Sequence, residues 1–157
     1  MNVEPSALDT TRQRAIPQFP FRVLVVDDNR DAADSTAQVL TICGATAQAC
    51  YNGEEALARL VSFNPDVCIL DVNMPGINGI DLAECVQVMA GGKPLLVALT
   101  AVDDERMRQR IADGVFDLHF VKPADPMTLF TALAEQLAQA RACEAASGDA
   151  GTSLLLR

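Results

Sequence analysis

Carboxylate, hydroxyl and ammonium side chains follow directly after four short apolar runs. The residues that end these runs are, in chain order, Asp27 with Asp28, Asp71, Thr100 and Lys122. An aspartate carboxylate can attack phosphorus and form an aspartyl phosphate. Lysine and hydroxyl groups can bind the oxygens of a transferring phosphoryl group. These residue types therefore suit phosphoryl transfer, provided that the fold brings them together.

The three aspartates also indicate a metal site. Asp27, Asp28 and Asp71 would repel one another in a shared crevice unless a cation lay among them. Ligands that are all oxygen favour Mg²⁺, with Mn²⁺ as a second possibility, and water completes the octahedron. The chain holds a single histidine, so a zinc site with several histidine ligands is excluded.

The apolar runs predict a parallel sheet. Residues 23–26, 67–70 and 95–99 are continuously apolar, and residues 118–121 are apolar apart from His119. Such runs are expected of strands buried on both faces; residues 46–49 form a weaker strand candidate. Between them, helical spacing predicts helices over residues 31–43, 54–63, 80–89, 103–113 and 126–142. Five strands alternating with five helices indicate a doubly wound α/β domain. In such sheets ligands bind beyond the carboxyl ends of the strands, where all the polar residues named above fall.

Length and composition predict one ordered domain with two flexible ends. The 157 residues, 50% of them hydrophobic, suffice for a single core. We expect a flexible leader over residues 1–20, the ordered domain over 21–142 and a flexible tail over 143–157. The net charge of −9 argues against nucleic acid binding.

The chain has neither an apolar signal segment nor an apolar stretch long enough to span a membrane. The five cysteines are odd in number and widely spaced, which favours free thiols. We therefore expect a cytoplasmic protein that is not associated with a membrane.

Residues 21–142 resemble the receiver domain of a two-component response regulator. The resemblance rests on four motifs, each of which ends an expected strand: Val-Val-Asp27-Asp28-Asn29, Leu70-Asp71-Val-Asn73-Met74-Pro75-Gly76-x-x-Gly79, Leu99-Thr100-Ala101 and Val121-Lys122-Pro123. Each motif alone is weak, but all four in this order are specific. The resemblance implies a flavodoxin-like fold, with five parallel strands in the order 2-1-3-4-5 and five helices.

The same resemblance assigns roles to the residues at the strand ends. Asp71 would accept a phosphoryl group from a histidine kinase or a phosphotransfer protein. Asp28 would bind Mg²⁺ directly and Asp27 largely through water, and Asp71 and the backbone carbonyl of Asn73 would complete the metal shell. Thr100 would move to bind the phosphoryl group, Lys122 would pair with its oxygen, and the bond to Pro123 would be cis.

His119 lies three residues before Lys122, where many receivers carry a switch aromatic. It would either rotate inward as Thr100 moves and report phosphorylation, or be a partly exposed histidine at a strand end with no signalling role. The positions that tune loss of the phosphoryl group in receivers correspond to Asn73 and Val102.

The implied function is a signalling switch that assists its own phosphorylation and dephosphorylation and is not an enzyme in the usual sense. Phosphorylation would change the surface of the fourth helix, fifth strand and fifth helix, and so control a downstream protein effector. The residues after the last expected helix are too few for an output domain. The chain would be a monomer, or a dimer that forms on phosphorylation.

Three alternatives remain. Residues 28–35 also resemble receivers joined to hybrid sensor kinases, which would make the domain a phosphate relay or sink. An unphosphorylated scaffold is a second reading. The third, a haloacid-dehalogenase-type phosphatase, would carry an Asp-x-Asp motif where this chain has Asp27-Asp28-Asn29.

Overall fold

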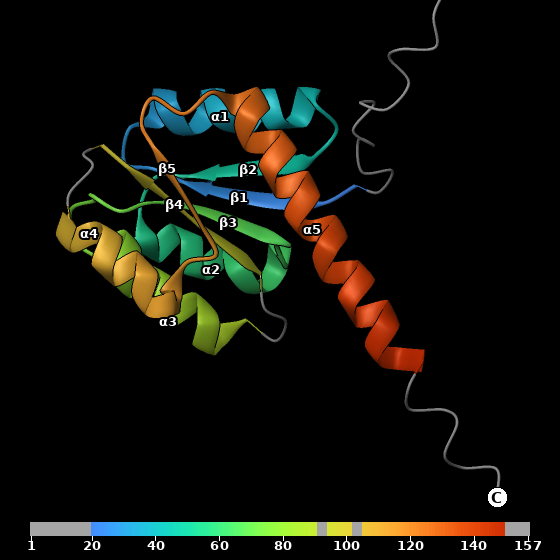
Figure 1. Cartoon of the computed structure of the whole chain (residues 1–157). Helices are drawn as coiled ribbons and strands as arrows, with labels where there is room; N and C mark the ends of the chain where they lie inside the picture. The colour runs from blue at the N-terminus through green and yellow to red at the C-terminus, as the bar shows by residue number, and fades with distance from the viewer. Residues whose placement is uncertain (1–19, 91–93, 102–104, 150–157) are drawn as a thin grey trace, which may run out of the picture.

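A five-stranded parallel sheet forms the centre of the computed structural model, which describes residues 20–90, 94–101 and 105–149 (Figure 1). The strands are β1 (Arg22–Val26), β2 (Thr46–Cys50), β3 (Val67–Asp71), β4 (Leu95–Thr100) and β5 (Leu118–Val121). Their order across the sheet is β2-β1-β3-β4-β5, and each neighbouring pair is parallel. The predicted doubly wound fold with strand order 2-1-3-4-5 is therefore confirmed.

Helices cover both faces of the sheet (Figure 1). The helices are α1 (Arg30–Ile42), α2 (Gly53–Phe63), α3 (Gly79–Met89), α4 (Glu105–Arg110) and α5 (Pro126–Asp149), with a π-helical turn, η1 (Ile111–Val115), after α4. One core packs the sheet against α1 and α5, and the other packs it against α2 and α3. In β3, Ile69 belongs to the first core and Leu70 to the second, because successive strand side chains point to opposite faces. Both side chains are fully buried.

Asparagine side chains begin three of the helices, at the carboxyl edge of the sheet. Oδ1 of Asn29 accepts a hydrogen bond from the N–H of Ala32, Oδ1 of Asn52 from that of Glu55, and Oδ1 of Asn78 from those of Ile80 and Asp81. Such caps satisfy backbone donors that have no partner in the first turn of a helix. The caps thereby fix where each helix begins, after short connections from β1 and β2 and after a longer loop from β3, and these loops carry the site.

Two helices differ from their predicted bounds. The helix predicted over residues 103–113 is α-helical only over Glu105–Arg110 and continues as the π-helical turn η1, in which Ile111 and Val115 pack against the core; residues 103 and 104 lie outside the described part. The predicted end of α5 at Ala142 was wrong, because the helix continues to Asp149. All side chains of residues 141–147 are exposed, so this extension depends on the helix propensity of its alanines rather than on core packing.

Within residues 20–90, 94–101 and 105–149, no helix combines the length and the apolar character needed to cross a bilayer.

Candidate functional site

Asp71 is the last residue of β3 and lies at the centre of the carboxyl edge, between β1 and β4. Only 3% of its surface is exposed. The backbone N–H of Asn73 donates a hydrogen bond to its Oδ1 at 3.1 Å. A Cβ atom on Gly79 would overlap the carbonyl oxygen of Asp71 and lie 2.7 Å from Cα of Val72. The loop after β3 can therefore fold back against the strand end only because residue 79 is a glycine.

Asp27 and Asp28 follow β1 and complete a cluster of carboxylates. Each of Asp27, Asp28 and Asp71 offers an oxygen within 4.8 Å of the others, the only such group of three or more metal-ligating side chains in the described part of the chain. Asp27 is buried, with 2% of its surface exposed, whereas Asp28 is exposed. The N–H of Asn29 donates to Oδ1 of Asp27 at 3.0 Å and fixes that carboxylate. One face of the cluster is thus held by the protein and the other opens to solvent.

Lys122 follows β5 and contacts two of the three carboxylates. Its Nζ donates a hydrogen bond to Oδ2 of Asp27 at 2.6 Å and lies 3.4 Å from Oδ2 of Asp71. Its side chain is 27% exposed. The bond from Lys122 to Pro123 is cis. The ammonium therefore lies between the two buried carboxylates rather than in bulk solvent.

The site shifts the pKa values of two of its groups. Burial raises the pKa of Asp71 from its ordinary 3.8 to about 6; the charge of Lys122 opposes this shift and the charge of Asp27 adds to it. Burial acts to lower the pKa of Lys122, but its hydrogen bond to Asp27 and the charges of both buried aspartates outweigh burial and raise that pKa above its usual value. A single ammonium thus compensates the cluster only in part.

Thr100 ends β4 beside Asp71 and is hydrogen-bonded to His119. Thr100 is 1% exposed, and its Oγ1 lies 2.9 Å from Nε2 of the partly buried His119 on β5. The backbone N–H of Lys122 donates to the carbonyl of Thr100 at 2.7 Å. The hydroxyl, the imidazole and the ammonium therefore belong to one connected part of the β4–β5 edge.

The structure thus places all the predicted polar side chains at one edge of the sheet. For Asn73 it shows the backbone N–H bound to Asp71, while the metal-binding role of its carbonyl stays a prediction. Val102 lies outside the described residues. The close packing under Gly79 and the position of Lys122 nearer to Asp27 than to Asp71 were not predicted. Gly79 was visible as part of a motif, but no sequence signal indicates which carboxylate the lysine approaches more closely.

Comparisons with known proteins agree with this geometry. Residues 23–134 match the family model described as "Response regulator receiver domain". The chain is 36% identical over 121 residues to the response regulator MprA of Mycobacterium ulcerans (strain Agy99), covering 77% of this chain and 49% of the relative. The MprA protein of Mycolicibacterium vanbaalenii is 35% identical over 124 residues, which are 79% of this chain and 50% of that protein. The chain therefore spans about half the length of these curated relatives.

Solved structures show the same fold. The chemotaxis protein CheY4 of Vibrio cholerae is 28% identical with a TM-score of 0.68, over 73% of this chain and 97% of CheY4. A CheY-like receiver domain protein of Methanospirillum hungatei JF-1 is 24% identical with a TM-score of 0.69, over 77% of this chain and 96% of that one, which supports the fold alone. With the family model covering most of the chain and the site geometry in place, this chain belongs to the response regulator receiver domain family.

Proposed function

We propose that this protein is a phosphorylation-dependent switch in which Asp71 is the phosphoacceptor. The observation that supports this most strongly is the position of Asp71: buried at the tip of the central strand, beside an acid pair and 3.4 Å from the ammonium of Lys122. In the proposed reaction, an oxygen of the Asp71 carboxylate attacks the phosphorus of a phosphohistidine on a histidine kinase or phosphotransfer protein. The P–N bond breaks, a P–O bond forms, and the imidazole leaves with the bonding electron pair.

The residues of the site fit a divalent cation. Three carboxylates lie together, one of them exposed, and among the described residues the ammonium of Lys122 is the one cation shown in contact with them. A donor set made of oxygens alone suits Mg²⁺, or Mn²⁺. Asp28 and Asp71 would hold the ion directly, Asp27 largely through water, and the Asn73 carbonyl would complete the protein ligands. When bound, the ion would neutralise charge on the phosphoryl oxygens.

Lys122 and Thr100 are the groups that would bind the phosphoryl oxygens after transfer. Lys122 is already within 3.4 Å of Asp71. Thr100 is hydrogen-bonded to His119 in this structure, so movement of its hydroxyl toward a phosphoryl group alters that contact. We propose that His119 couples this movement to the surface formed by α4, β5 and α5, and that a protein effector reads the surface. The proposed setting is the cytoplasm.

Intact mass measurement after incubation with acetyl phosphate and Mg²⁺ tests the phosphoacceptor directly. We expect a labile adduct of one phosphoryl group on the wild-type chain and none on Asp71→Asn. Asp113→Asn, which removes an exposed carboxylate on η1 outside the cluster, should keep the adduct. An adduct that persists in Asp71→Asn would refute the assignment of Asp71.

Absence of any adduct on the folded wild-type chain would instead favour an unphosphorylated scaffold. A relay or sink, as in a hybrid kinase, predicts the adduct and also its passage onward. Incubating the purified phosphorylated chain with a phosphotransfer protein and following radiolabelled phosphate distinguishes this alternative from an effector switch.

A further inference from the structure

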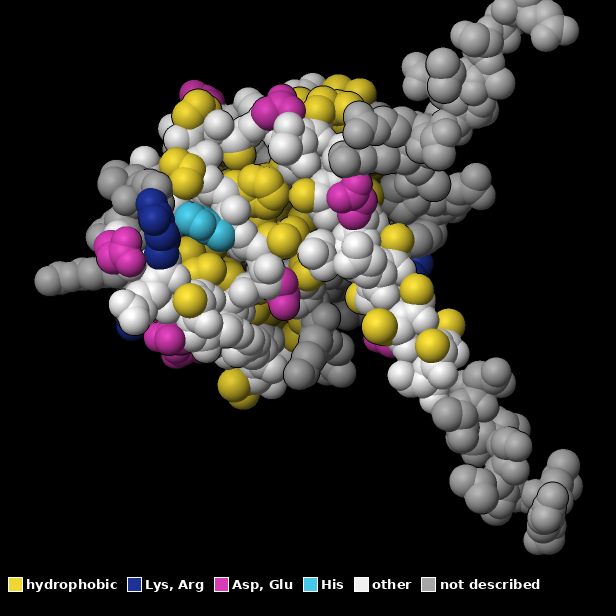
Figure 2. All heavy atoms as spheres, viewed as in Figure 1, with side chains coloured by type: hydrophobic (Ala, Val, Ile, Leu, Met, Phe, Trp, Pro, Cys, Tyr) yellow, Lys and Arg dark blue, Asp and Glu magenta, His cyan; other side chains and the backbone are white. Residues whose placement is uncertain are grey.

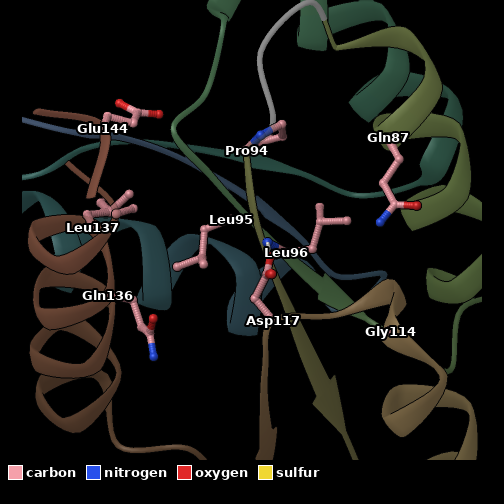
Figure 3. Close-up of a pocket in the computed structure, with 10 residues that line it drawn as sticks. Gln87, Pro94, Leu95, Leu96, Gly114, Asp117, Gln136, Leu137 and Glu144 are labelled. Carbon is pink, nitrogen blue, oxygen red and sulfur yellow. Dashed lines mark hydrogen bonds between the residues drawn. The ribbon is translucent and has the colours of Figure 1, made fainter. Parts of the chain in front are cut away.

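A groove of about 570 Å³ lies at the amino ends of β4 and β5, at the opposite end of the sheet from the phosphoacceptor site. Figure 3 shows Leu137 of α5 on one side, pointing toward Leu95 of β4, with Asp117 beside the start of β5 and Gln87 of α3 on the far side. Figure 2 shows hydrophobic side chains gathered in a hollow beside α5, with acidic side chains at its margins.

The groove has an apolar wall and an acidic part. Pro94, Leu95, Leu137 and Ala140 form an apolar wall, and Asp117 and Glu144 supply two carboxylates. Both acidic residues are exposed. An occupant that matched both walls would carry apolar side chains and at least one cation. An acidic or wholly polar segment would not match.

We propose that this groove binds the segment of the same chain that follows α5, with Leu154, Leu155 and Leu156 against the apolar wall and Arg157 near the two carboxylates. Residues 150–157 read Ala-Gly-Thr-Ser-Leu-Leu-Leu-Arg and contain no acidic side chain. Three consecutive leucines followed by an arginine match both characters of the groove.

The length of the segment permits this contact. Glu144 in the groove is five residues before the end of α5 at Asp149, which is about 7.5 Å along the helix. Five extended residues from Asp149 to Leu154 span up to about 17 Å, and two more reach about 23 Å. Leu137, at the far end of the groove, lies about 18 Å back along the helix. Gly151 allows the chain to reverse direction after α5.

Because the segment is tethered to α5, even a weak intrinsic affinity is sufficient to keep the groove occupied. A short linker gives an effective concentration of the order of millimolar. An intrinsic dissociation constant of about 1 mM would then leave the groove occupied for half of the time or more. The inference concerns the edge of the sheet far from Asp71 and does not depend on phosphorylation.

Backbone amide NMR of the full chain tests the proposal. The tail variant carries Leu154→Ser, Leu155→Ser and Leu156→Ser together. We expect it to shift the amide resonances of Leu95, Asp117 and Ala140, and to speed amide exchange in residues 141–147 by about two- to tenfold, because that stretch loses a contact. Changes confined to residues 147–157 would overturn the proposal.

A charge-reversal pair tests the polar half of the contact. Glu144→Lys should shift the Leu95 and Asp117 resonances in the same direction as the tail variant, and Arg157→Glu in the Glu144→Lys background should restore them. Glu54→Lys, which reverses an exposed charge on α2, is the matched control and should leave these resonances unchanged. Failure of Arg157→Glu to restore them, or shifts that grow with protein concentration and so indicate a second copy as occupant, would refute docking of the chain's own tail.

Discussion

At the scale of single residues, the site carries more negative charge than its lysine balances. Asp27 and Asp71 share the ammonium of Lys122 at 2.6 and 3.4 Å, while the nearby Asp28 faces solvent. Like charges at this range repel even when one of them is exposed. Asp28 is therefore the residue whose charge is most easily removed without breaking a buried ion pair.

Asp28→Asn should stabilise the metal-free protein and abolish its response to Mg²⁺. Removing one of three adjacent negative charges relieves repulsion, worth up to about 1 kcal/mol for an exposed group. It also removes a proposed direct ligand, so the stabilisation that Mg²⁺ gives by binding the folded state is lost. Urea unfolding with and without MgCl₂ measures both effects, with Asp113→Asn as the control. A full Mg²⁺ response in Asp28→Asn would contradict the proposed ligand.

The cysteines should differ sharply in reactivity. Burial, aided by the charge of Glu55, raises the pKa of Cys50 to about 11, and burial raises the pKa of Cys68 to about 12. Because only the thiolate reacts, both should resist a maleimide at about pH 8, whereas the exposed Cys143 reacts. Mass spectrometry after labelling checks this, and labelling in urea should modify all five cysteines. Rapid native labelling of Cys68 would contradict the buried position.

At the scale of elements, the loop between β3 and α3 depends on Gly79. A methyl group at this position meets backbone atoms of Asp71 and Val72, which cannot move without displacing Asp71 itself. The corresponding contact at Gly53 is with the side chain of Ile77 at 2.9 Å, and a side chain can shift more easily than a strand.

Gly79→Ala should therefore destabilise the protein by about 1–3 kcal/mol, the usual cost of overpacking, and more than Gly53→Ala does. Chemical unfolding of both variants against the wild type measures the difference. Equal costs for the two substitutions would show that the β3–α3 loop yields as readily as a side chain.

The bounds of the strands and helices show which features of the fold could be predicted from the sequence and which could not. Continuous apolar runs located the strands to within about one residue, because burial on both faces demands apolar side chains throughout. The end of α5 was missed because its apolar stripe stops at Leu137, while the alanines beyond are exposed and continue the helix outside the core. The motifs predicted that Asp71, Thr100 and Lys122 lie at one edge of the sheet. The close approach of Lys122 to Asp27 depends on side-chain rotamers, which a sequence motif does not specify.

At the scale of the whole molecule, one sheet joins two cores. Phe21 stacks on Phe130 of α5 with ring centroids 5.6 Å apart on the α1–α5 side, while α2 and α3 pack on the other face. Because β1, β3 and β4 each contribute side chains to both cores, we expect the two cores to unfold together.

Ile69→Ala and Leu70→Ala should each lower the free energy of unfolding by about 2–5 kcal/mol, although their side chains lie on opposite faces of β3. Both variants should still unfold in a single transition, with far-UV circular dichroism and tyrosine fluorescence coinciding. Unfolding in two steps in either variant would show that the two faces are independent. Val61→Ala, at an exposed site on α2, is the control and should cost little.

The asparagine caps also bear on the electrostatic potential at the carboxyl edge of the sheet. β1, β2 and β3 are parallel, and α1 and α2 begin shortly after the carboxyl ends of β1 and β2. The longer loop after β3 folds back, with the N–H of Gly79 donating to the carbonyl of Val72 at 3.2 Å, so the capped starts of α1, α2 and α3 all lie at the edge that holds the aspartates. The aligned peptide groups of a helix give its first turn a partial positive charge of about half an elementary charge. The backbone itself therefore supplies positive potential where the side chains are most acidic. A phosphoryl group transferred to Asp71, as proposed above, would therefore be stabilised by the first turns of these helices as well as by Lys122.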